Sequence, residues 1–155
     1  MSLSTAYLTL KQKQIWDLKG KGLLEASIAR KLDVSRQTVH KALNVANAKV
    51  SQALQETAKL NKIRIKTVDP INGILVGYSP EFKTTAMITF SARNGVQIWY
   101  RHEGDCENCE QLPACRKSLL AEAKERDIGL TEDQKSMLPS QLAEILFSKI
   151  IGERK

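Results

Sequence analysis

The three cysteines of this 155-residue chain lie within ten residues of one another, close enough for their sulfur atoms to bind one metal ion. Cys106 and Cys109 form a C-x2-C pair, and Cys115 follows after five intervening residues. His102 precedes the pair at the end of an expected strand. Zinc accepts three thiolates and one imidazole in a tetrahedral arrangement. The spacing therefore predicts a zinc site formed by Cys106, Cys109, Cys115 and His102.

Two other interpretations of the cysteines stay open. An iron–sulfur cluster would need a fourth ligand, from His102, Asp105 or a partner chain. Alternatively, the three thiols bind no metal. A disulfide framework is not expected, because the number of cysteines is odd. A structural zinc would join the expected sheet to the helices that follow it. An exchangeable or redox-active metal would instead make the chain a sensor.

A second set of chemically useful side chains follows Ser35, at the start of an expected helix. Serine is a favourable N-cap, and the polar side chains after it suit base edges and phosphates in the major groove of duplex DNA. Arg36 and Gln37 have the bidentate geometry that reads bases, whereas His40 and Lys41 suit either bases or phosphates. The expected DNA-binding residues are Ser35, Arg36, Gln37, Thr38, His40, Lys41 and Asn44.

Residues 22–43 have the pattern of a helix-turn-helix that would position these side chains. Ala29 falls where the two helices cross, and a larger side chain there would push them apart. Residues 33–35 make the turn. A preceding helix is expected from Thr9, which has capping-box spacing to Gln12, as far as Gly20 or Gly22. The apolar positions that would lock the two helices together are Ile28, Leu32, Val34 and Val39.

The run LTLKQKQIWDLKGKGLLEASIARKLDVSRQTVHKAL resembles the helix-turn-helix of LuxR-type regulators and of the sigma-factor region that reads promoter elements. Archaeal Tfx-type regulators share this layout. Leu8, Thr9 and Gln12 match the opening L-T-x-x-Q of the group, while Asp33 stands where the turn often has glycine. The resemblance implies duplex DNA binding, with the positions that usually meet DNA at Ser35, Arg36, Gln37, His40 and Lys41. Residues 62–155 match no family pattern.

The third helix is expected to continue to Asn61, because no glycine or proline interrupts it. Its apolar residues recur at spacings of three and four and are largely Ala and Val, which suits close packing of two helices. The preferred interpretation is a dimerisation helix that pairs two recognition helices in a homodimer. The alternative is packing on the chain's own C-terminal half. The stripe comprises Val39, Leu43, Ala46, Val50, Ala53, Leu54 and Ala58.

After Asn61 the apolar period changes to two, which predicts a small antiparallel sheet followed by helices. Asn94-Gly95 predicts a two-residue type I′ hairpin turn. The chain is therefore expected to be α+β, with a DNA-binding domain at 1–61 and a metal-binding or regulatory domain at 62–155. Strands are expected at 62–66, 74–78, 84–92 and 96–101, and helices at 115–126 and from 138 onward.

The positive charge is concentrated in the part that carries the helix-turn-helix. Residues 1–61 hold ten Lys and Arg against four Asp and Glu, whereas residues 62–155 hold fourteen against thirteen. Phosphate neutralisation requires such an excess. The candidate phosphate contacts are Lys11, Lys13, Lys19, Lys21 and Arg30.

The remaining sequence signals favour a cytoplasmic transcription regulator rather than an enzyme. The chain has no apolar run of the ~18 residues that cross a membrane, and no signal-peptide pattern. Phosphate-loop, dinucleotide-binding and nucleophile-elbow motifs are also missing from the sequence. The alternative functions are a metal or redox sensor, and an interaction module that docks on the transcription machinery. RNA binding is the weakest candidate, because the aromatic residues form no recognised stacking pair.

Overall fold

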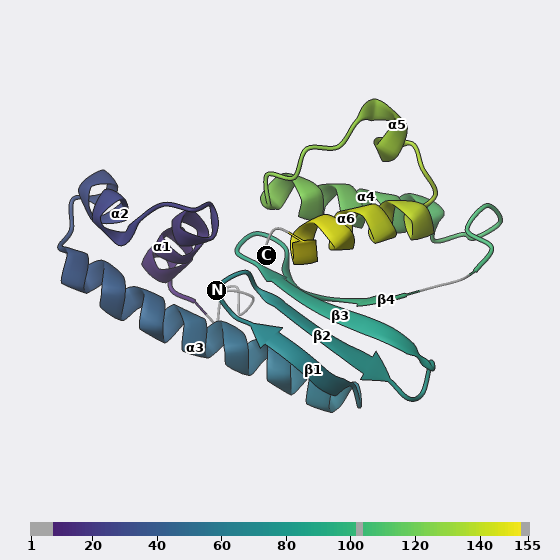
Figure 1. Cartoon of the computed structure of the whole chain (residues 1–155), viewed down its shortest axis with the longest axis horizontal. Coiled ribbons are helices and arrows are strands. Elements are labelled where there is room, and N and C mark those ends of the chain that lie inside the picture. Colours follow the sequence, from purple (N-terminus) through teal and green to yellow (C-terminus); the bar gives the residue numbers. More distant parts are fainter. Residues whose placement is uncertain (1–7, 102–103, 153–155) are drawn as a thin grey trace. The chain divides into compact units, whose positions relative to one another are not determined.

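The computed structural model describes residues 8–101 and 104–152, which fold as an α+β chain (Figure 1). The chain divides into two compact units, Met1–Tyr100 and Arg101–Lys155, here called the N-terminal unit and the C-terminal unit. The N-terminal unit contains α1 (Leu10–Gly20), α2 (Glu25–Leu32), α3 (Arg36–Leu60), β1 (Arg64–Asp69), β2 (Ile74–Ser79), β3 (Thr84–Ser91) and β4 (Gly95–Tyr100). The C-terminal unit contains α4 (Leu112–Glu125), α5 (Glu132–Lys135) and α6 (Pro139–Gly152). The α+β class expected from the sequence is confirmed.

Side-chain caps determine where several of the helices begin. The Thr9 hydroxyl accepts the backbone N–H of Gln12, and the Gln12 side chain accepts the N–H of Thr9, as the capping-box spacing predicts. Ser35 caps α3 by accepting the N–H of Thr38 at 3.0 Å. The same reciprocal box recurs at the start of α5. Each cap satisfies N–H groups that the first helical turn leaves unpaired.

The first three helices share a small apolar core. Its buried members are Ile15, Ile28, Ala29, Val39 and Leu43. Leu32 and Val34, expected to lock the two helices, pack against this core while remaining partly exposed. Asp33 ends α2 in the left-handed conformation, with φ 52°. The turn therefore uses aspartate where glycine would adopt the same conformation at lower cost.

The second half of α3 packs on one face of the sheet, whose strands are antiparallel in the order β1-β2-β3-β4. Figure 1 shows α3 continuing past α1 and α2 to run alongside the sheet. The core between them contains Ala46, Val50, Leu54 and Ala58 from the helix and Leu75, Ala86, Ile88 and Phe90 from the strands. The interpretation of the stripe as a dimer face is therefore wrong, because α1, α2 and the chain's own sheet cover it.

A tryptophan from α1 joins the helices to the sheet. The Trp16 indole N–H donates to the carbonyl of Pro70 at 3.0 Å, in the loop between β1 and β2. Its ring packs edge-on against Phe90 of β3, with centroids 5.3 Å apart. The structure therefore groups the sheet with the first three helices. The domain boundary expected after Asn61 differs from this division, which falls after Tyr100.

The three hairpin loops are built alike. In each, a side-chain oxygen accepts the N–H of the residue three positions later, and the next residue has positive φ. The accepting residues are Asp69, Ser79 and Ser91, and the residues with positive φ are Gly73, Lys83 and Gly95. The two-residue turn expected at Asn94-Gly95 is wrong. The register pairs Ser91 with Gly95 and leaves three residues, 92–94, in the loop.

In the C-terminal unit, α4 packs against α6. Glu122 of α4 is fully buried, and its carboxylate pairs with the guanidinium of Arg126 at 2.8 Å. Arg116 donates to the carbonyls of Ser136 and Met137, which ties α4 to the segment before α6. Among the described residues, no helix has the length and apolar character needed to cross a membrane.

Candidate nucleic-acid interface

The polar residues at the start of α3 form an exposed surface. All seven predicted DNA-binding side chains, Ser35, Arg36, Gln37, Thr38, His40, Lys41 and Asn44, are exposed. Val39 and Leu43 of the same helix are buried in the core beneath them. Residues four apart lie above one another on a helix, so Arg36, His40 and Asn44 form one row. Gln37 and Lys41 form the adjacent row.

Two of the seven side chains have a structural role within the helix. The hydroxyls of Ser35 and Thr38 lie 2.7 Å apart, and Ser35 also accepts the N–H of Thr38. These bonds fix the position at which α3 begins. The five side chains left for base or phosphate contacts are Arg36, Gln37, His40, Lys41 and Asn44.

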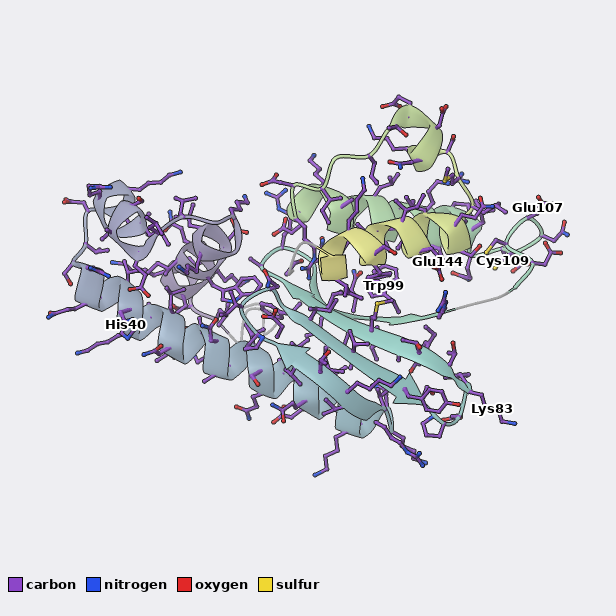
Figure 2. All side chains as sticks on the ribbon, viewed as in Figure 1. His40, Lys83, Trp99, Glu107, Cys109 and Glu144 are labelled. Carbon is purple, nitrogen blue, oxygen red and sulfur yellow. The ribbon has the colours of Figure 1, made fainter. Side chains whose placement is uncertain are left out.

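One contact in this surface was missed by the sequence analysis. Nδ1 of His40, a residue of α3 labelled in Figure 2, lies 3.2 Å from Oε1 of Glu25, the first residue of α2. The His40 side chain is 60% exposed and the Glu25 side chain 23% exposed. Fifteen positions separate the two residues, so no short-range sequence signal indicates the contact.

The positive charge belongs to the whole N-terminal unit. Residues 1–100 hold fifteen Lys and Arg against six Asp and Glu, a net charge of +9. Residues 101–155 hold nine against eleven, a net charge of −2. The difference in net charge between these two units is larger than the difference between residues 1–61 and 62–155.

The five candidate phosphate contacts differ in their surroundings. Lys11 and Arg30 are exposed, whereas Lys13 and Lys19 are half-buried. Lys21 forms an ion pair with Asp17 at 3.2 Å. A further cation, Lys49, donates a hydrogen bond to the Gln12 side chain and so connects α3 to α1. Lys11 and Arg30 are therefore the most accessible of the five.

The cysteine cluster occupies the loop before α4 and the first turn of that helix. Cys106 is buried, Cys109 and Cys115 are exposed, and all three are free thiols. Figure 2 labels Cys109 and Glu107 on this loop. The Asp105 carboxylate accepts a hydrogen bond from the side-chain amide of Asn108 at 2.6 Å. His102, the fourth predicted ligand, lies outside the described residues.

The described part of the cluster does not form a complete ligand set. Within residues 8–101 and 104–152, no three His, Cys, Asp or Glu side chains are grouped so that they could hold one metal ion. The zinc prediction therefore rests on the types and spacing of these residues.

Compared with known proteins, the chain matches no family model, no curated protein and no solved structure.

Proposed function

We propose that this protein is a transcription regulator that binds duplex DNA through α2, the turn at 33–35 and the first half of α3. The observation that supports this most strongly is the two-sided character of α3. It buries Val39 and Leu43 while presenting two rows of base- and phosphate-binding side chains. The resemblance of residues 8–43 to LuxR-type, sigma-factor and Tfx-type helix-turn-helix segments agrees with the proposal. So does the net charge of +9 on the same unit.

In this proposal α3 enters the major groove with its N-terminal half. Arg36 and Gln37 read base edges through paired hydrogen bonds, and Lys41 and the exposed cations of α1 and α2 contact phosphates. The second half of α3 is held by the sheet. The recognition residues are thus presented on a helix that is anchored at its other end, which limits the entropy lost on binding.

Arg36→Ala tests the assignment of base reading. We expect the variant to lose about 1–3 kcal/mol of binding free energy on a selected duplex, and much less on a scrambled duplex. Arg64→Ala, an exposed arginine on β1, is the matched control and should preserve the preference for the selected duplex. Fluorescence anisotropy with both duplexes measures the effect. Equal losses on the two duplexes would remove Arg36 from base reading, and no binding to any duplex would contradict the proposed function.

We also propose that the cysteine cluster binds one structural zinc ion through Cys106, Cys109, Cys115 and His102. Three free thiols within ten residues support this, two of them in the loop before α4 and the third, Cys115, in the first turn of that helix. Bound zinc would join the loop that carries Cys106 and Cys109 to the first turn of α4.

Elemental analysis and a visible spectrum of anaerobically purified protein test the zinc proposal. We expect one zinc per chain without colour, and loss of that zinc in Cys109→Ser. Iron with a brown absorbance would instead support the sensor function. Protein without metal would contradict both metal proposals.

The remaining partners stay predictions. A homodimer would give paired half-sites, but it would need a surface other than the covered stripe of α3. Docking of the C-terminal unit on the transcription machinery is the alternative interaction function. DNA binding also agrees with the cytoplasmic location expected from the sequence.

A further inference from the structure

The contact between Glu25 and His40 determines which nitrogen of the imidazole carries the hydrogen. A carboxylate only accepts hydrogen bonds, so the Nδ1 atom that faces it at 3.2 Å must be the donor. In the neutral ring, Nε2 is then a bare acceptor. The side chain is 60% exposed in the row that also contains Arg36 and Asn44.

We infer that Glu25 is a positioning residue for DNA recognition, which makes His40 a hydrogen-bond acceptor toward a base. In the major groove, an acceptor pairs with the amino group of cytosine or adenine and not with the acceptor atoms of guanine or thymine. His40 therefore selects adenine or cytosine over guanine or thymine on the strand that it contacts, at one position of the site. This inference rests on the proposed function.

The position of Glu25 explains why it can act in this way without contacting DNA. As the first residue of α2, Glu25 lies at the N-terminal end of that helix. It reaches across the turn to a residue in the second turn of α3. The orientation of the His40 side chain on α3 therefore depends on how α2, which carries Glu25, packs against α3.

The test is selection from a randomised duplex pool at about pH 8. We expect the wild-type full-length chain to prefer adenine or cytosine over guanine or thymine about fivefold at one position of one strand, as one hydrogen bond allows. That preference should fall below about twofold in Glu25→Gln and in His40→Ala. The preference at the position read by Arg36 should persist. Glu56→Gln, an exposed glutamate on α3, removes the same charge and should leave every preference unchanged.

Nitrogen NMR tests separately whether Glu25 sets the tautomer of His40. The chain has two histidines, so only two imidazole spin systems need assignment. We expect His40 to carry its hydrogen on Nδ1 in the wild type and to shift toward the Nε2–H form in Glu25→Gln. Thermal unfolding of each variant verifies that it is folded.

The outcomes separate this inference from the proposed function. If the wild type selects a site but Glu25→Gln keeps every base preference, the Glu25–His40 contact is structural only and the inference is overturned. The same holds if His40→Ala keeps every preference. If the wild type enriches no sequence from the pool, the proposed function fails, and the inference fails with it.

Discussion

Single backbone positions matter most where the chain bends sharply. Gly73 closes the loop between β1 and β2 with φ 62°, and its carbonyl accepts the N–H of Phe90 at 2.8 Å. A Cβ atom at this position would overlap the Phe90 carbonyl oxygen and touch the Trp16 ring. Because Trp16 links α1 to the sheet, this glycine supports the contact that unites the N-terminal unit.

Gly73→Ala should therefore destabilise the protein by about 2–4 kcal/mol, since it combines left-handed strain with a clash against backbone. Gly95→Ala is the matched control. It has φ 70° and nothing within 4 Å of the added atom, so only the strain of about 1–2 kcal/mol applies. Urea unfolding measures both. Equal losses would mean that the close approach at Gly73 has no energetic consequence.

At the scale of single elements, α2 differs from α1 and α3 in its N-terminus. Leu24 occupies the N-cap position with the extended conformation that caps adopt, but it offers no hydrogen-bonding side chain. The side chain is 69% exposed, so little packing would be lost by replacing it. The N–H groups of the first turn of α2 therefore have no side-chain cap from this position.

Leu24→Ser should raise the stability of the N-terminal unit by about 0.5–1 kcal/mol, because a serine at this position can accept an N–H of the first turn. Ser35→Ala, which removes an existing cap from α3, should lower it by about 1 kcal/mol. The midpoint of thermal unfolding reports both changes. An unchanged or lower midpoint for Leu24→Ser would show that this helix gains nothing from a cap.

At the scale of the whole molecule, α3 is the element that connects recognition to the core. Its 25 residues span about 37 Å. The first half carries the exposed polar rows, and the second half is buried against the sheet. This division predicts that a charge placed in the stripe disrupts folding and does not simply separate two chains.

Val50→Asp should cost at least about 3 kcal/mol, because it places an unpaired carboxylate at a position with 0% exposure. Val45→Asp is the control, since Val45 lies on the same helix and is 45% exposed. It should change stability by no more than about 0.5 kcal/mol. Circular dichroism and light scattering together measure folding and mass. A folded Val50→Asp monomer derived from a wild-type dimer would restore the stripe as an interface between chains.

The sequence alone determined the features that depend on neighbours three or four positions apart. The caps at Thr9 and Ser35 are examples, because their hydrogen bonds join residues i and i+3. The core positions of the helix-turn-helix were predictable for the same reason. The exposed face of α3 could be recognised because helical periodicity separates its polar residues from Val39 and Leu43; it comprises Arg36, Gln37, His40, Lys41 and Asn44.

Which surface covers each apolar face, and which distant groups meet, depends on tertiary packing. The stripe on α3 has the same pattern whether it packs on a second chain or on its own sheet, because burial of apolar surface is not directional. The bond from Trp16 to Pro70 and the contact of Glu25 with His40 join residues far apart in the sequence. Their pairing depends on how the elements pack, and packing is a property of the whole unit and not of any local pattern.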